Sequence, residues 1–523
     1  MPRTLASQRV FAADEIMMGV LCHLDASHFR LLAVTSRSSY DRFNNDGWRT
    51  VDGLGNILAV LDDQLVARGS GPGTPTCQIP RAQHVVQKRK EKFVKLCSVV
   101  NELNMYANPK KWVEWQNLEY LCDMVEPAAR PLFPNLRSIT VSIAGTKHIL
   151  LYPLMVVFGN RFLQSFCILG DPSAAYIRSN AQDSVRALQT LHNRQSRRET
   201  ELRELSIFPD EHSDDARGNL REALSVFLPR LEVLTISHWC LDVAMLQALG
   251  SSSIKHLAIV GRFAAIVSPL AVDTMMITDQ YFAHLETLEL KAIDLSDACQ
   301  LLARHEILQK VKSLRVALFP VNDLVTEPGP LYLTICRSIG QAHLLQKLIM
   351  VAGQDERDIP FPLPPTMMNL IANRPLRVLR LYNFCLVDEA GFQKFHAWQD
   401  LVHLSIMRQD LRPEDFVMFA QLPNLTHLGA NISETLGQPW LGGYPSVFPT
   451  RLNLATPFRF HSSSEYNLSN RKTIHRIEHL FLELCPHDVR IEVERIFKRG
   501  NTKDVQDLRW ANDLLTGLRD LVL

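Results

Sequence analysis

Apolar residues recur along this chain in one short pattern. A leucine is followed by a second leucine three residues later and by another apolar residue two positions further on. This alternation predicts a strand, with the fourth and sixth side chains in the core and the third, fifth and seventh on the opposite face. Strict copies begin at Leu202, Leu231, Leu285, Leu345, Leu376, Leu401 and Leu518, and weaker copies begin at Leu136, Leu163, Ile254, Val311, Leu425 and Ile477.

The copies follow one another at similar intervals. From Leu202 to Leu425 the starts advance by 29, 23, 31, 26, 34, 31, 25 and 24 residues. The intervening segments carry helix signals, such as the stretch from Asp242 to Leu249, which begins on an N-cap residue and is followed by Gly250. A unit of strand, turn and short helix cannot bury its apolar face alone, so stacked units are expected to share one core.

The tract from roughly Leu136 to Leu523 resembles the leucine-rich-repeat family, whose repeats run at about 20–29 residues. The resemblance implies an α/β fold, a right-handed solenoid of strands and helices. This chain departs from the family at the ninth position of the repeat, where the family commonly has asparagine or cysteine. Because Trp239, Ile293, Phe384 and Gln409 stand there instead, we expect apolar packing in place of the polar ladder and an irregular solenoid.

The first fifty residues carry a different pattern, that of short amphipathic helices. Such a module is too small to bury its apolar residues alone, so it needs a partner or a dock on the solenoid. The segment resembles the F-box from Glu15 through Ser36 and Arg37 to Trp48, although Ala12 and Ala13 replace the usual Leu-Pro. The apolar residues expected to face an adaptor or to form the core of the box are Ile16, Val20, Leu21, Leu24, Phe29, Leu32 and Tyr40.

These patterns divide the chain into three parts. Residues 1–52 are the expected F-box-like helical module, residues 53–110 a linker with an amphipathic helix over Arg81 to Tyr106, and residues 111–523 the solenoid. The linker prediction rests on the turn-rich stretch from Gly69 to Pro75. A divergent box on a long irregular leucine-rich tract is similar to the architecture of fungal F-box-like proteins.

The charge balance disfavours nucleic-acid and membrane-surface partners. Lys plus Arg number 56 against 55 Asp plus Glu, which gives a net charge of +1, whereas nucleic-acid binders usually carry a basic excess. Ten cysteines include no C-x-x-C pair, and no apolar run approaches the length of a membrane span. We therefore expect a protein of the cytoplasm, the nucleus or both, with free thiols.

Searches for catalytic motifs return nothing. The chain contains no P-loop, no G-x-G-x-x-G, no G-x-S-x-G and no H-E-x-x-H. We expect no enzyme activity, no catalytic residues, no cofactor and no metal. The third position of the repeat does carry histidine at His256, His403, His427 and His479, and His403 and His427 belong to consecutive repeats. A metal or pH-switched site there and a row of ordinary half-exposed histidines are both open readings.

The face formed by the odd positions of the repeat is the expected binding surface. Its charges are mixed, which suits a protein partner better than a nucleic-acid backbone. The residues expected to contact a substrate are Arg315, Lys347, Arg380, Tyr382 and His403.

The two resemblances together imply a function. The box would dock a Skp-type adaptor and through it a cullin, and the solenoid would bind a protein substrate for the resulting ubiquitin ligase. The alternative from a different class is a leucine-rich-repeat interaction scaffold whose N-terminal helices only cap the solenoid.

Overall fold

The computed structural model describes fifteen segments of the chain, which form two compact units. The segments are residues 48–61, 76–105, 114–124, 131–143, 151–170, 180–195, 201–208, 214–261, 281–319, 329–353, 361–386, 394–411, 418–432, 453–455 and 490–492. Unit 1 extends to Cys240 and includes Ser252–Ile254, and unit 2 contains Leu241–Ser251 and the chain from Lys255 onward. The residues assigned above to the F-box-like core, Ile16 to Tyr40, lie outside the described segments.

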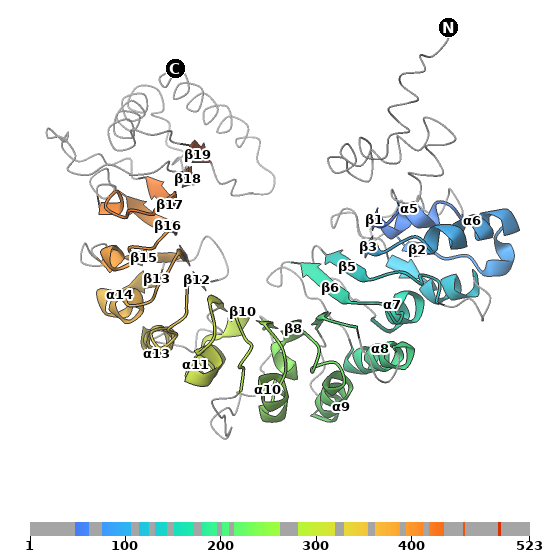
Figure 1. Cartoon of the computed structure of the whole chain (residues 1–523), viewed down its shortest axis with the longest axis horizontal. Coiled ribbons are helices and arrows are strands. Elements are labelled where there is room, and N and C mark those ends of the chain that lie inside the picture. The colour runs from blue at the N-terminus through green and yellow to red at the C-terminus, as the bar shows by residue number, and fades with distance from the viewer. Residues whose placement is uncertain are drawn as a thin grey trace, which may run out of the picture. The chain divides into compact units, whose positions relative to one another are not determined.

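Unit 1 is a parallel sheet with helices on one side (Figure 1). Its strands lie in the order β1 (Thr50–Asp52), β3 (Glu102–Asn104), β5 (Ser138–Ile143), β6 (Ser165–Gly170), β7 (Glu204–Ile207) and β8 (Val233–Ser237), and β2 (Thr76–Gln78) pairs separately with β4 (Glu114–Gln116). The helices are α5 (Leu54–Leu58), α6 (Gln87–Cys97), α7 (Leu151–Phe158), α8 (Ala181–Arg194) and α9 (Asp214–Ser225), with 3₁₀ helices at Ala82–His84, Leu118–Met124 and His238–Cys240.

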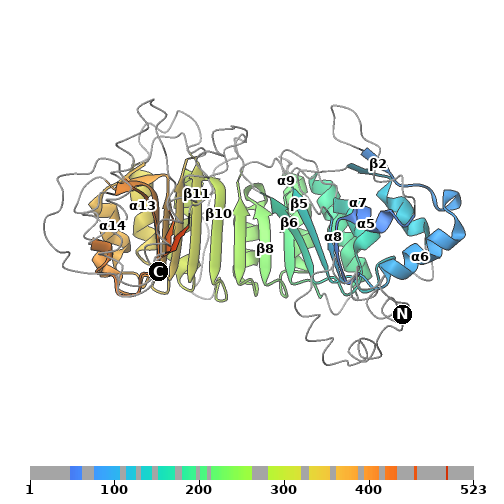
Figure 2. The same ribbon diagram turned by 90° about the horizontal axis from the view of Figure 1, so that it is seen from above.

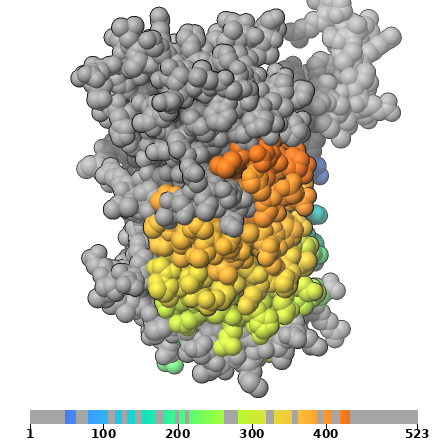
Figure 3. Space-filling view, turned by 90° about the vertical axis from the view of Figure 1, so that its left-hand side faces the viewer, coloured from blue at the N-terminus to red at the C-terminus, as the bar shows by residue number. Residues whose placement is uncertain are grey.

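Unit 2 repeats this plan, and its strands lie side by side in chain order (Figure 2). They are β9 (His256–Val260), β10 (Thr287–Asp294), β11 (Ser313–Phe319), β12 (Lys347–Ala352), β14 (Val378–Tyr382), β16 (His403–Leu411), β17 (His427–Ile432), β18 (Asn453–Ala455) and β19 (Arg490–Glu492), with a separate pair β13 (Phe361–Leu363) and β15 (Phe384–Leu386). The helices are α10 (Val243–Gly250), α11 (Leu295–Leu302), α12 (His305–Leu308), α13 (Gly329–Ile339), α14 (Pro365–Ala372) and a 3₁₀ helix at Lys394–Ala397. Successive repeats form stacked layers (Figure 3).

The leucine pattern sets the register of both sheets. In unit 2 the fourth-position leucines pair strand by strand, from Leu288 through Leu314, Leu348, Leu379 and Leu404 to Leu428, and all are buried. In unit 1, Leu205 pairs with Leu234 in the same way. Burying one leucine side chain contributes about 1.5–3 kcal/mol, so the row is a large share of each core. The predicted α/β solenoid and its strands are confirmed where described; the copies at Ile477 and Leu518 lie outside the described segments.

One backbone carbonyl per repeat reinforces this register. The carbonyl of Lys312 accepts from the N–H groups of Gln346 (2.8 Å) and Lys347 (3.0 Å), and that of Gln346 accepts from Arg377 (2.7 Å) and Val378 (3.0 Å). The second-position residue supplies the same carbonyl at other strand pairs of both units, for example Arg137 and Arg203 in unit 1 and Arg377 and Val402 in unit 2. At these positions the next repeat hydrogen-bonds the backbone carbonyl that precedes the strand, whatever side chain the second-position residue carries.

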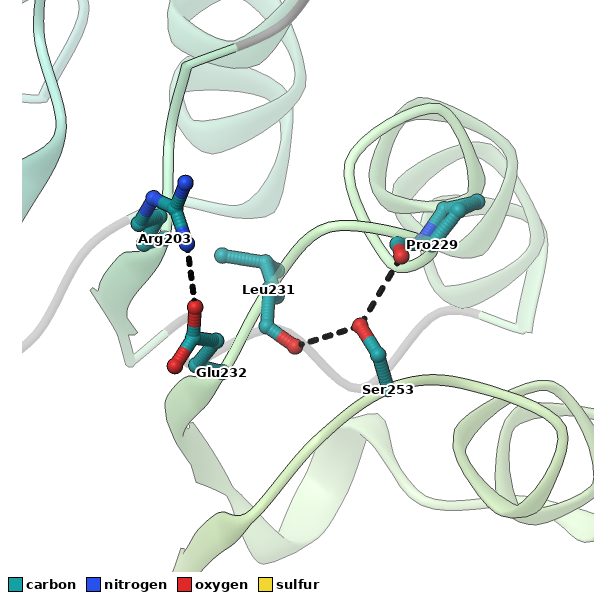
Figure 4. A network of polar contacts seen from close by, with 5 residues as sticks. All are labelled: Arg203, Pro229, Leu231, Glu232 and Ser253. Atoms are coloured by element: carbon teal, nitrogen blue, oxygen red, sulfur yellow. Dashed lines mark hydrogen bonds and ion pairs between the residues drawn. The ribbon is translucent and has the colours of Figure 1, made fainter. Parts of the chain in front are cut away.

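Two side chains of unit 1, each preceding a strand, bridge to backbone carbonyls of the preceding repeat. Buried Asn160 donates to the carbonyls of Phe133 (2.7 Å) and Leu136 (2.8 Å), one repeat earlier. Ser253 donates in the same manner to Pro229 (2.8 Å) and Leu231 (3.2 Å), as Figure 4 shows. At the ninth position the expected apolar packing is present, because Trp239, Ile293 and Phe384 are all buried; the side chain of Gln409 lies outside the description.

The solenoid begins earlier than the sequence predicts. The expected linker, residues 53–110, contains β3, which pairs with β1 at Val51↔Leu103 and with β5 at Leu103↔Ile139. Its amphipathic helix is also shorter, since α6 spans Gln87–Cys97 rather than Arg81 to Tyr106. The boundary was missed because β1 and β3 each have three residues and a single buried one, which leaves no hexamer to recognise.

A bulge in β10 brings two backbones into close contact in unit 2. The register shifts between Lys291 and Ile293, and Ala292 at the bulge has a positive φ of 56°. Gly261 donates its N–H to the Lys291 carbonyl (2.6 Å), and a Cβ added at this glycine would overlap the Ala292 carbonyl oxygen. Only glycine fits this approach.

We expect Gly261→Ala to lower the free energy of unfolding by about 1–3 kcal/mol, because the methyl group must displace backbone. The matched control is Gly218→Ala in α9, where an added Cβ meets no atom within 4 Å. This control should raise stability by about 0.5–1 kcal/mol through helix propensity. Urea unfolding of both variants checks the pair, and equal effects at the two sites would refute the close approach.

The Asn160 bridge should also be measurable. Asn160→Ala leaves two buried carbonyls without their donor, so we expect a loss of about 1–3 kcal/mol. Asn424→Ala removes one exposed bond, from Asn424 to the Gln399 carbonyl (3.0 Å), and should change stability by less than about 0.5 kcal/mol. Thermal unfolding of the two variants side by side distinguishes a structural bridge from a surface contact.

Candidate functional site: the strand face of unit 2

The register of unit 2 arranges the odd positions of the repeat in three rows. We call these rows the unit 2 strand face. The third-position row is His256, Thr287, Ser313, Lys347, Val378, His403 and His427; the fifth is Ala258, Glu289, Arg315, Ile349, Arg380, Ser405 and Gly429; the seventh is Val260, Lys291, Ala317, Val351 and Tyr382. Neighbouring strands lie about 4.8 Å apart, so residues of one row on adjacent strands are in contact range.

The residues predicted to contact a substrate come together on this face. They come from four strands that are neighbours in the sheet: Arg315 from β11, Lys347 from β12, Arg380 and Tyr382 from β14, and His403 from β16. Arg315 and Arg380 flank Ile349 in the fifth-position row. Arg315 and Lys347 are exposed, whereas Arg380, Tyr382 and His403 are half-buried. The placement of the set is therefore as predicted, and its use by a substrate remains a prediction.

Four of the side chains form what we call the cationic cluster: Lys347, Arg380, His403 and His427. Arg380 Nε donates to His403 Nε2 at 3.2 Å. The rings of His403 and His427 stack with centroids 5.3 Å apart and an interplanar angle of 15°. The expectation that the two histidines lie side by side is confirmed.

The cluster has a measurable electrostatic signature. Burial, and then the charges of Arg380, His427 and Lys347, lower the pKa of His403 to about 4. His403 is therefore neutral near pH 7, and its ring accepts the hydrogen bond from Arg380. Within the part of the chain that the structure describes, neither Lys347 nor Arg380 forms an ion pair with a carboxylate. The cluster therefore presents uncompensated positive charge.

The one acidic side chain in these rows is already paired. Glu289 forms an ion pair with Lys291, and His256 Nε2 lies 3.7 Å from Glu289 Oε1. Burial tends to raise the pKa of Glu289, but Lys291, His256 and Arg315 outweigh it and the pKa is lowered. Sequence reasoning did not find this pair, because the two partners of the His256 contact lie in different repeats and only the register places them on adjacent strands.

Apolar side chains lie among these charges. Ile349 is only 8% exposed although it is on the strand face, and Val351 and Val378 beside it are half-buried. Val351 pairs in register with Tyr382. The unit 2 strand face thus places positive charge next to apolar side chains.

The strand face of unit 1 has a different chemistry. Its odd positions are mostly small and uncharged, including Ser138, Thr140, Cys167, Ser206 and Thr235. Two of its carboxylates accept hydrogen bonds from hydroxyl groups on the adjacent strand: Ser165 Oγ donates to Glu204 at 2.6 Å, and Thr50 Oγ1 donates to Glu102 at 3.2 Å. Among the described strand-face residues, the cationic cluster thus belongs to unit 2.

Metal binding was one reading of the histidine row. Among the described residues, no three His, Cys, Asp or Glu side chains gather closely enough to hold a metal ion. His403 accepts a hydrogen bond from Arg380 and stacks on His427, and His479 lies outside the described segments. None of the described helices is long and apolar enough to span a bilayer.

The lowered pKa of His403 predicts a pH dependence. The unfolded state titrates near pH 6.5 and the folded state near pH 4, so the unfolded chain binds more protons between these values. The free energy of unfolding should therefore fall as the pH drops from about 6.5 towards 4. His238, whose pKa is lowered to about 4 by burial and Arg217, adds a fall in the same direction.

His403→Gln should make this fall shallower, and His403→Gln with His238→Gln shallower still. Urea midpoints at pH 7 and pH 5 measure the effect. An unchanged pH slope in the His403 variant would contradict a neutral His403 in the folded state.

Comparison with known proteins adds little beyond the fold. No family model and no curated protein matches this chain. The solved structures that resemble it include an internalin from Listeria monocytogenes, with 13% identity over 73% of this chain and 93% of the internalin and a TM-score of 0.31. The TLR13–ssRNA13 complex matches with 18% identity over 70% of this chain and 47% of TLR13, at a TM-score of 0.36.

The ectodomain of the receptor kinase GASSHO1/SCHENGEN3 from Arabidopsis thaliana matches with 12% identity over 74% of this chain and 47% of that chain, at a TM-score of 0.24. This chain thus spans about half the length of the two receptors. All three are leucine-rich-repeat proteins. At such low identities and scores, the conclusion that this chain forms a leucine-rich-repeat solenoid rests on its own register of strands.

Proposed function

We propose that this chain is the substrate-recognition subunit of a Skp/cullin/F-box-type ubiquitin ligase. In this proposal residues 12–48 dock a Skp-type adaptor, and the unit 2 strand face binds the protein substrate. The observation that carries the substrate-binding half is the cationic cluster with its neighbouring apolar side chains, which lie on a face that carries no described helix. The adaptor half rests on the resemblance of the N-terminal segment to the F-box.

The proposed role requires no chemistry from the chain itself. A recognition subunit raises the effective concentration of the substrate near the ligase's ubiquitin-conjugating enzyme, and proximity accounts for the acceleration. Buried leucines and the hydrogen bonds on the second-position carbonyls hold the strands of the sheet in register. This rigidity suits the role, since a preorganised surface loses little conformational entropy on binding. We accordingly propose a non-catalytic subunit without a cofactor.

The short connection between the two parts supports their joint action. Trp48, which ends the F-box-like motif, lies two residues before β1, and β1 is already a member of the sheet of unit 1. A connection of this length restricts the N-terminal module relative to unit 1 more than a long flexible linker would.

Composition and surface chemistry favour protein partners in the cytoplasm or nucleus. The balanced net charge and the single acidic interruption by Glu289 disfavour a nucleic-acid backbone, which selects uniform positive charge. The alternative function is an interaction scaffold outside the ubiquitin pathway, whose N-terminal helices cap the solenoid. The two functions differ in whether an adaptor binds.

The test is co-elution of the full chain with a Skp-type adaptor on size-exclusion chromatography. We expect a stable complex with the wild-type chain and its loss in the Leu24→Asp, Phe29→Asp double variant, because charges would enter an apolar interface. The control is Val86→Asp, which places the same charge at a valine that is 66% exposed on unit 1 and should leave the complex intact.

Circular dichroism must show the same helix content and melting temperature for the double variant and the control, so that a lost complex reports binding rather than unfolding. A folded wild-type chain that never co-elutes with the adaptor would contradict the ligase role and leave the scaffold function.

A further inference from the structure

We propose that the unit 2 strand face binds an acidic segment of a partner polypeptide, with aspartate or glutamate carboxylates placed against the cationic cluster. This inference rests on the proposed function in one respect, that the face is where a partner binds. It names the chemistry of that partner, and it applies equally to a ligase subunit and to a scaffold.

The strand face carries a net positive charge once the ion pairs within it are taken into account. Glu289 and Lys291 neutralise each other, and His256 completes that group. Arg315, Lys347 and Arg380 remain, on three neighbouring strands, and within the described residues Lys347 and Arg380 have no carboxylate partner. Complementary charge on a partner would be negative.

The spacing of these cations fits a chain crossing the strands. Adjacent strands are about 4.8 Å apart, so Arg315, Lys347 and Arg380 span about 10 Å across the sheet. In an extended peptide, side chains on one face repeat every 6–7 Å or so. Two or three alternate carboxylates can therefore meet long, flexible Lys and Arg side chains without distortion of the sheet.

The apolar neighbours favour a polypeptide over other anions. Ile349 and Val351 lie between the two arginine-bearing strands, and Val378 and Tyr382 border them. Ile349 is already buried, but a sugar-phosphate backbone would leave the half-buried Val351, Val378 and Tyr382 uncovered, whereas the aliphatic portions of a peptide can bury them.

The histidine pair couples this binding to protons. His403 is faced by Arg380 from β14, by Lys347 from β12 and by His427 from β17, and no described carboxylate faces it. A carboxylate arriving from a partner would offset these positive charges and raise the pKa of His403 from about 4. Since the bound state then holds more protons than the free state, affinity should rise as the pH falls from 7 towards 5.

The probe is a fluorescein-labelled peptide of about eight residues that alternates Glu with Val, long enough to cross the cluster. Binding to the full chain is measured by fluorescence anisotropy at low salt, at pH 7 and pH 5.5. The comparison probes are the same peptide with Gln for Glu, the same peptide with phosphoserine for Glu, and a single-stranded oligonucleotide of equal charge. We expect the Glu peptide to bind at least about tenfold more tightly than the Gln peptide.

The variant Lys347→Glu, Arg380→Glu should weaken binding of the Glu peptide at least about tenfold. The matched control is Arg377→Glu, an exposed charge in the same repeat that lies one residue before β14 and outside the three rows; it should change binding less than about twofold. His403→Gln should bind at pH 7 but lose the gain in affinity at pH 5.5.

Several outcomes would overturn the proposal. They are equal binding of the Glu and Gln peptides, equal losses in the Lys347/Arg380 variant and in Arg377→Glu, or binding confined to the phosphoserine peptide or to the oligonucleotide. The adaptor complex is scored in the same Lys347/Arg380 variant, where it should be intact. Loss of peptide binding and loss of adaptor binding are thus separate results, and failure of the adaptor test leaves this inference standing.

Discussion

The buried leucine at the fourth position of each repeat is the contact on which the rest of this structure depends. In unit 2, Leu348 pairs in register with Leu314 on one side and Leu379 on the other, and all three are fully buried. A slip of one residue in the strand pairing would turn every such leucine to the opposite face of the sheet. The slip is strongly unfavourable because it would expose the buried apolar area of these leucines to water. The paired N–H groups on each second-position carbonyl fix the same register through the backbone.

That register also decides which side chains meet on the strand face. Side chains that are far apart in sequence, such as Arg380 and His403 at a separation of 23 residues, become neighbours because their leucines are neighbours. Since the core fixes the even positions, the odd positions are free to vary in chemistry. Unit 1 carries small hydroxyls there, and unit 2 carries the cationic cluster. The same fold thus supports surfaces of different specificity, which is why function must be argued from the face rather than from the solenoid.

Much of this arrangement could be predicted from the hexamers alone. Leucine spacing identified the strands and their inward positions, and consecutive hexamers placed His403 beside His427. The first strands could not be found, because Val51 and Leu103 are single buried residues without a pattern around them. The Asn160 bridges were also hidden, since an isolated asparagine carries no periodic signal and its bonds depend on the path of the preceding loop.

Ion pairs and pKa values of the side chains were harder to predict from the sequence than the strands. The sequence indicated a row of histidines but not their partners: His256 lies against Glu289, whose position follows only from the strand pairing and the side-chain conformation. The half-burial of His403, which lowers its pKa, depends on how closely its neighbours pack. Such quantities come from three-dimensional packing, and a pattern of residue types does not contain them.

The most direct test of the account is the pKa of the His403 side chain in the intact protein. It can be followed by NMR of histidine-labelled protein, with the signal assigned by its absence in His403→Gln. The account predicts titration near pH 4 in the wild type and a higher pKa when Lys347 and Arg380 are both replaced by Gln, with burial, the larger cause, still holding the pKa below the ordinary value. Titration of His403 near pH 6.5 in the wild type would contradict the claim that strand register assembles Lys347, Arg380, His403 and His427 into one cationic cluster.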